Sequence, residues 1–117
     1  MEYRKLGRSG LKVSPLVLGG NVMGWTADEA RSFAILDAYI EAGGNIIDTA
    51  DVYPRFAGGF EGGESEGVLG KWLKQRSDRE KLVIATKVGG DMGSGKSLSR
   101  QHILRSAEGS LRRLQTE

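Results

Sequence analysis

Cysteine is absent from this sequence, and histidine occurs only once. Without cysteine the chain has neither a disulfide nor a thiolate metal site, and such a composition is typical of a reducing, cytoplasmic compartment. The single histidine leaves carboxylates as the main metal ligands, and no calcium-loop spacing is present. We therefore predict a cytoplasmic protein that holds no metal ion.

Long apolar runs are also lacking, and neither sign of charge dominates. No run could span a bilayer, and Met1–Lys5 lacks the apolar core of a signal peptide. The net charge of +2, with both signs interspersed, gives no basis for a nucleic-acid or membrane partner. A length of 117 residues, 38% hydrophobic and 27% charged, predicts one modest globular domain over residues 1–117.

Glycine, in contrast, is abundant, and it separates short apolar runs. Residues 3–15 have the pattern of a hairpin around the turn Gly7–Gly10. Three further apolar runs are each followed by a loop, and we expect them to be buried strands: Leu16–Leu18, Asn45–Asp48 and Leu82–Lys87.

A helical pattern follows each of these three runs. Thr26 and Glu29 have the spacing of a capping box at the start of the first helix, which Gly43 ends. The second helix is expected from about Ser65, with Trp72 in the core. Ser99 is expected to cap the third, whose apolar stripe comprises Ile103, Ala107, Leu111 and Leu114. The alternation of strands and helices predicts an α/β fold with a parallel sheet.

Three ionisable residues, Asp48, Tyr53 and Lys87, lie at or just beyond the ends of the second and third strands. Carboxyl ends of parallel strands are where α/β proteins place their chemistry. Because side chains alternate along a strand, Asp48 and Lys87 are expected to point into the same space. An ammonium group beside a tyrosine favours the phenolate, so this phenol could exchange a proton with a carbonyl oxygen. The alternative is a structural Asp–Lys pair with an unrelated loop tyrosine.

At these residues the sequence resembles the aldo-keto reductase family. The matching segments occur in the family's order and cover nearly the whole chain: Arg4–Gly7, Gly10–Ser14, Leu18–Gly20, Asn45–Tyr53, Gly63–Glu66, Ala85–Gly89 and Ser110–Leu114.

This resemblance implies an NADPH-dependent reductase of aldehydes or ketones on a TIM-type (β/α)8 barrel, whose bottom is closed by the amino-terminal hairpin. It implies that Tyr53 is the general acid, that Lys87 supports it and that Asp48 holds Lys87. Gly20 and Asn21 match the loop beside the nicotinamide, where Asp48 also lies, and Trp25 could line the substrate pocket.

Such a barrel needs about 250 residues, whereas this chain supplies the hairpin and three β/α units. The family's catalytic histidine would lie just beyond residue 117, so we expect an amino-terminal fragment whose activity alone is doubtful. The face carrying Ile46 and Val83 would be uncovered, which predicts self-association. A non-catalytic remnant or a partner-binding module is the alternative function.

A second motif, Gly90–Ser97, fits the phosphate-loop pattern G-x-x-x-x-G-K-[ST] between a strand and a helix. A nucleotide site is therefore a further, less favoured alternative, since the next helix is expected to begin only after Ser99. Three further groups are expected to lie in solvent: the acidic residues Glu61, Glu64 and Glu66, the pair Arg112–Arg113, and His102.

Overall fold

The computed structural model describes residues 1–117, and it contains an antiparallel hairpin and a parallel sheet. Strands β1 (Arg4–Lys5) and β2 (Lys12–Val13) form the hairpin. The parallel sheet has the order β3-β4-β5. Its strands are β3 (Leu18–Gly19), β4 (Ile46–Asp48) and β5 (Val83–Ala85).

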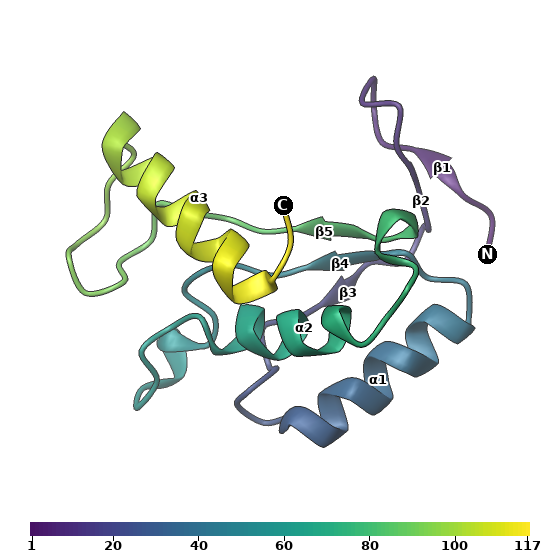
Figure 1. Cartoon of the computed structure of the whole chain (residues 1–117), viewed down its shortest axis with the longest axis horizontal. Coiled ribbons are helices and arrows are strands. Elements are labelled where there is room, and N and C mark those ends of the chain that lie inside the picture. Colours follow the sequence, from purple (N-terminus) through teal and green to yellow (C-terminus); the bar gives the residue numbers. More distant parts are fainter.

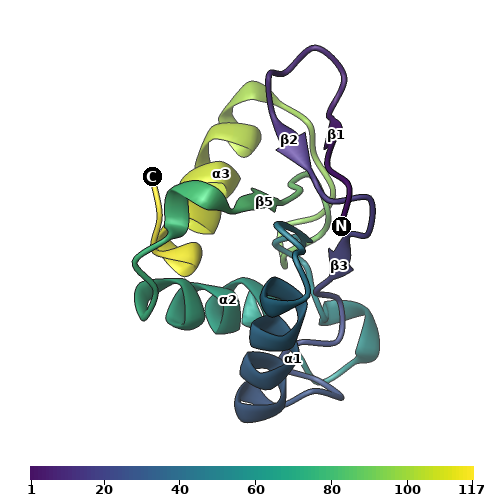
Figure 2. The ribbon, with the colours of Figure 1, turned by 90° about the vertical axis from the view of Figure 1, so that its right-hand side faces the viewer.

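The chain also forms three α-helices, which connect or follow the strands of the sheet. They are α1 (Glu29–Glu41), α2 (Glu64–Lys74) and α3 (Arg100–Leu114), with short 3-10 turns η1 (Arg55–Ala57) and η2 (Arg79–Lys81). Helices α1 and α2 lie on the same side of the sheet (Figure 1), and the hairpin lies at the end of the sheet where β4 begins (Figure 2). The predicted hairpin and three β/α units are therefore confirmed.

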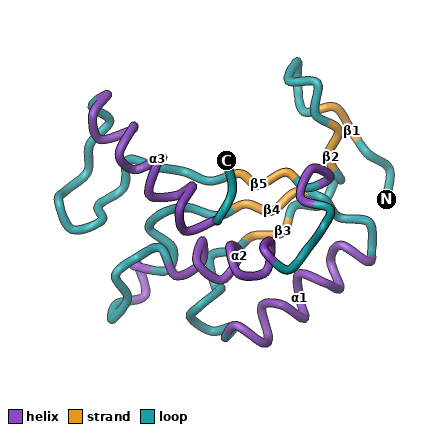
Figure 3. The backbone as a smooth tube through the Cα atoms, viewed as in Figure 1, coloured by secondary structure: helices purple, strands orange, loops and turns teal.

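The hydrophobic core lies where α1, α2 and the last turn of α3 meet the sheet (Figure 3). Ile47, in the middle of β4, is fully buried there, because its side chain points away from the face that carries Asp48. The core comprises Met23, Leu36, Tyr39, Ile47, Leu69, Trp72, Leu73, Leu82 and Leu114. None of the helices is long and apolar enough to cross a membrane.

The hairpin is tied to the start of β4, and this corrects one expectation about the sheet. Ser14 donates its backbone N–H to Asn45 Oδ1 at 2.8 Å, and the Tyr39 hydroxyl donates to the Ile46 carbonyl at 2.8 Å. With its neighbours fixed in this way, Ile46 is buried, and Val83 on the same face is half-buried. The prediction that this face is uncovered is therefore wrong at Ile46.

The beginnings of two elements also differ from the sequence-based predictions. Leu16 and Val17 are exposed, and the strand in this region is Leu18–Gly19. Helix α1 is capped by Asp28, whose carboxylate accepts the N–H of Arg31 at 2.8 Å, and not by Thr26. Thr26 and Asp28 are both good capping residues, so the turn that precedes the helix decided at which of them the helix begins.

Helix α3 begins after Ser99 as predicted, but of the expected apolar stripe only Leu114 lies in the core. The hydroxyl of Ser99 accepts the N–H of His102 at 3.2 Å. Ile103 and Leu111, expected in the core, are exposed, whereas Gly109 and Ser110 are buried. Helices α2 and α3 approach closely, so the contact favours small residues over the apolar stripe.

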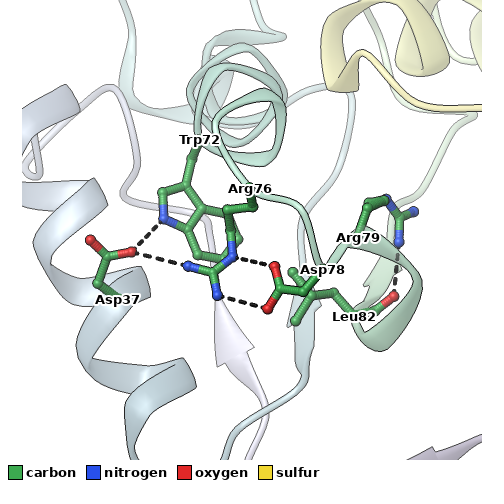
Figure 4. A network of polar contacts seen from close by, with 6 residues as sticks. All are labelled: Asp37, Trp72, Arg76, Asp78, Arg79 and Leu82. Carbon is green, nitrogen blue, oxygen red and sulfur yellow. Dashed lines mark hydrogen bonds and ion pairs between the residues drawn. The ribbon is translucent and has the colours of Figure 1, made fainter.

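A polar network ties α2 to α1 and to the turn before β5 (Figure 4). Arg76 donates to both carboxylate oxygens of Asp78, at 2.8 and 2.9 Å, and lies 4.6 Å from the centroid of the Trp72 ring. The Trp72 indole N–H donates to Asp37 at 2.8 Å. Trp72 is thus a core residue, as predicted, with its polar edge satisfied.

Replacing Asp78 by asparagine is expected to make stability less dependent on pH. The hydrogen bond from Arg76 holds the pKa of Asp78 below its ordinary value, so this carboxylate stabilises the fold above its unfolded pKa. That contribution is lost as the pH falls through the lower, folded pKa. We expect Asp78→Asn to lower the free energy of unfolding by about 0.5–1 kcal/mol at pH 7, with the difference closing as the pH falls below the folded pKa of Asp78.

Urea unfolding of both proteins across this pH range measures the effect. Glu80→Gln is a matched control, because Glu80 is exposed and forms no ion pair. If the difference in the free energy of unfolding between Asp78→Asn and the parent chain stayed constant with pH, the stabilising role of the Asp78 carboxylate would be contradicted.

Candidate active site

Asp48 and Lys87 meet at the carboxyl edge of the parallel sheet. Asp48 ends β4, where it pairs with Ala85 of β5, and Lys87 follows two residues after Ala85. The Lys87 ammonium group donates to Asp48 Oδ2 at 2.8 Å and to the Thr49 carbonyl at 2.7 Å. The parity of the two strands therefore brings both side chains into one space, as predicted.

The Asp48–Lys87 pair is open to solvent. The Lys87 side chain is 48% exposed and that of Asp48 is 41% exposed. An exposed ion pair contributes little to stability. The pair is therefore accessible to a bound molecule, and its small contribution to stability does not by itself account for its presence.

Tyr53 approaches this pair from the loop after β4. The Lys87 ammonium nitrogen lies 4.9 Å from the centroid of the Tyr53 ring. The loop is held by a hydrogen bond from the Ser65 N–H to the Tyr53 carbonyl, at 3.2 Å. The three ionisable residues found by sequence position are thus brought together.

The surroundings of Lys87 keep it protonated. Burial lowers the pKa of Lys87, but the hydrogen bond to Asp48 and the nearby Tyr53 phenol outweigh it, so the pKa lies above its ordinary value. A lysine that stays charged at neutral pH places a permanent positive charge beside the phenol.

Two aromatic side chains extend the surface next to Tyr53. Phe56, in η1, meets the Tyr53 ring edge-on with centroids 6.1 Å apart, and Trp25 meets Phe56 edge-on at 5.4 Å. Trp25 and Phe56 are both exposed. No sequence pattern predicted that Phe56 would lie next to Tyr53, because its position depends on how the loop from Ala50 to Gly63 folds.

Gly20 and Asn21 lie at the end of β3, beside Asp48. Gly20 donates its N–H to the Asp48 carbonyl at 2.7 Å, and its own carbonyl accepts the Ser65 hydroxyl at 2.6 Å. A side chain at Gly20 would come within 3.3 Å of the Asp48 carbonyl, so glycine allows this close approach. Asn21 is exposed.

The phosphate-loop motif has a different geometry from a nucleotide site. The Asp91 carboxylate accepts the N–H groups of Gly93 and Gly95 at 2.8 and 2.9 Å. These bonds lower the pKa of Asp91. A carboxylate thus takes the amide groups that a phosphate would need, and α3 begins only at Arg100, so the structure does not favour the nucleotide alternative.

A buried ion pair behind the site was missed by sequence reasoning. Glu66 is fully buried, where it accepts Arg113 Nε at 2.7 Å and the Thr86 hydroxyl at 2.6 Å. The predictions that Glu66 and His102 lie in solvent are wrong, because both are buried, and Arg113 is half-buried. The first turn of α2 and the last turn of α3 face each other, which no local pattern indicated.

Comparisons with known proteins agree with this architecture. The family model described as Aldo/keto reductase family matches residues 15–117. The chain is 42% identical to an uncharacterized oxidoreductase, YrpG, of Bacillus subtilis, over 100% of this chain and 37% of that protein. The structure of the aldo-keto reductase AKR11C1 from Bacillus halodurans, holo form, superposes with a TM-score of 0.81 at 38% identity, over 99% of this chain and 37% of that one.

The fold is thus the hairpin and the first three β/α units of a TIM-type barrel, with ionisable side chains gathered at its carboxyl edge. The chain belongs to the aldo/keto reductase family of oxidoreductases. It corresponds to the amino-terminal part of these relatives and spans less than half of their length. It is also 56% identical, over 79% of its length, to an uncharacterized 11.2 kDa protein in the crtE 3′ region of Pseudescherichia vulneris, of which the match covers 90%.

Proposed function

We propose that the chain carries the proton-transfer site of an NADPH-dependent carbonyl reductase, with Tyr53 as general acid. The observation that carries this proposal is the position of Lys87, whose ammonium group bonds to Asp48 and lies against the Tyr53 ring. The three groups lie at the carboxyl edge of a parallel sheet, where barrel enzymes bind substrate.

The chain's own residues supply the proton step. As the carbonyl carbon is reduced, negative charge develops on its oxygen, and the Tyr53 hydroxyl donates its proton there to give the alcohol. The Lys87 ammonium group stabilises the phenolate left behind, and water restores its proton. Asp48 keeps Lys87 charged and oriented through the 2.8 Å hydrogen bond.

Residues that fit the nicotinamide end of the cofactor are present beside this trio. Asn21 and Asp48 are accessible at the strand ends, and the N–H of Gly20 joins the two strands there by its hydrogen bond to the Asp48 carbonyl. Bound NADPH would supply the hydride to the carbonyl carbon. We propose NADPH over NADH from the family resemblance, and the cytoplasmic location stays a prediction.

The substrate we propose is a small carbonyl compound with an apolar part. Phe56 offers exposed ring surface beside the Tyr53 ring, and Trp25 extends that surface beyond Phe56. Flat aromatic faces favour apolar or aromatic groups.

A non-catalytic, self-associating module is the second candidate, supported by the uncovered surface of the chain. Ile103, Leu104 and Leu111 of α3 are exposed, and the outer strands β3 and β5 each pair on one side only. Apolar helix surface and open strand edges favour association with a second copy.

Titration with NADPH, followed by Trp25 fluorescence, is expected to show saturable binding. Trp25 lies beside Phe56 near the proposed nicotinamide site, so its emission should change, whereas Trp72 is buried in the core. Trp25→Phe is the control, and calorimetry should show that it binds NADPH without the optical change. Light scattering on the same samples measures self-association.

Absence of binding at millimolar NADPH would contradict the reductase proposal. If the chain is then oligomeric, the second candidate gains support. A monomer that melts cooperatively would argue against self-association.

A further inference from the structure

A cavity of about 330 Å³ lies along one face of α3, apart from the trio at the sheet edge. His102, Arg105, Ser106, Gly109 and Arg112 line it from α3, at the spacing of one helix face. Asp51 lines it from the loop after β4. Asp48, Tyr53 and Lys87 do not take part, so the cavity is separate from the proposed active site.

Two buried polar side chains in this cavity each have one polar atom without a hydrogen-bond partner. Asp51 is 2% exposed and its Oδ2 forms no hydrogen bond, and His102 is 9% exposed with its Nε2 unbonded. Leaving such groups unpaired is costly, so a molecule that bonds to both would be favoured. Burial, and after it the nearby Glu66, raise the pKa of Asp51 above its ordinary value.

The cavity also has an excess of positive charge. Arg105 and Arg112 form no ion pair, and Arg113 uses its Nε for Glu66 while its side chain also lines the cavity. Guanidinium groups bind phosphate and carboxylate oxygens through paired N–H donors. Gly109 leaves room at the helix surface, because an added Cβ would lie 3.2 Å from Arg113 Nη1.

We propose that this cavity binds a phosphate group that retains a P–OH hydrogen, as inorganic hydrogen phosphate does. The arginines and His102 would donate to the phosphate oxygens, and the P–OH would donate to Asp51 Oδ2. An oxyanion without a hydrogen, such as sulfate, leaves that carboxylate unpaired and repelled. This inference goes beyond the proposed reductase activity and does not depend on it.

The test is NMR titration of the full chain with phosphate and with sulfate, at equal ionic strength and pH 7. We expect phosphate to shift the signals of α3 and to bind about tenfold more tightly than sulfate, because one charge-assisted hydrogen bond differs. The double change Arg105→Gln and Arg112→Gln should weaken phosphate binding about tenfold or more. Arg100→Gln, an exposed arginine of the same helix outside the cavity, is the matched control and should have no effect.

Asp51→Asn tests the selectivity directly. An amide can donate to either anion, so this variant should bind sulfate about as tightly as phosphate. Its thermal melt shows whether it is folded, and Ser106→Ala offers a milder change in the same cavity. Equal binding of both anions by the unchanged chain, or no loss in the double arginine variant, would overturn the proposal.

An organic phosphomonoester in parallel distinguishes free phosphate from a phosphorylated metabolite. At pH 7 a phosphomonoester is mainly a dianion without a P–OH hydrogen, since its second pKa is about 6. We therefore expect it to bind as weakly as sulfate, which points to free phosphate. Binding as tight as that of inorganic phosphate would contradict the bond from the P–OH to Asp51.

Discussion

Replacing Tyr53 by phenylalanine is expected to lower the turnover number for carbonyl reduction by about a hundredfold to ten-thousandfold, the usual contribution of a general acid. The change removes only the hydroxyl group, so the ring stays against Lys87 and Phe56. Cofactor affinity should remain within about twofold, because the proton is needed in the transition state and not for binding. Steady-state assays with NADPH and an aromatic aldehyde measure turnover, and calorimetry measures affinity.

Tyr3→Phe is the matched control. The Tyr3 hydroxyl donates to the Gly43 carbonyl at 2.6 Å, far from the sheet edge, so its loss removes a phenol without touching the trio. Unchanged turnover in Tyr53→Phe would contradict the assignment of Tyr53 as the general acid. A loss in both variants would mean that stability, not proton transfer, had been measured.

Replacing Gly70 by alanine is expected to lower the free energy of unfolding by about 3 kcal/mol or more, the upper range for overpacking. Gly70 lies in α2, where α3 crosses it, and an added Cβ would collide with the backbone carbonyl oxygen of Arg113. The backbone cannot yield as a flexible side chain would, so the two helices must move apart. Separation would also disturb the Glu66–Arg113 ion pair.

Gly67→Ala, one turn earlier in the same helix, makes the same chemical change in open space. No atom lies within 4 Å of a Cβ at this position, so higher helix propensity should stabilise the chain by about 0.5–1 kcal/mol. Chemical unfolding of both variants gives the comparison. Similar stability changes of the same sign in the two variants would contradict the close-packing explanation.

Local sequence patterns predicted the elements that place the candidate site. The hairpin, the three strand–helix units and the cap at Ser99 follow from glycine turns, apolar periodicity and capping chemistry, which act over a few residues. Strand parity alone was enough to place Asp48 and Lys87 on one face, since alternation is a property of the extended backbone.

Other features depended on contacts between distant segments. The burial of Glu66 arises because Arg113 and Thr86 meet it, and these residues are far apart in the sequence. Ile46 is covered because Ser14 and Asn45 join the hairpin to β4, and Phe56 reaches Tyr53 because a long loop turns back. Each is a long-range arrangement that no window of neighbouring residues contains.

The sequence by itself therefore determined the order of the elements, the strand ends and the three ionisable residues that meet there, because those depend on local geometry and on motifs. Only the tertiary structure decided which face of α3 is buried. A stripe of isoleucine and leucine predicts burial, but α2 and α3 approach so closely that an added Cβ at Gly70 would collide with the Arg113 carbonyl oxygen, and Gly109 and Ser110 of α3 are buried. Which residues of the stripe reach the core depends on how α3 lies against α2 and the sheet, a long-range arrangement that buries Leu114 and leaves Ile103 and Leu111 exposed.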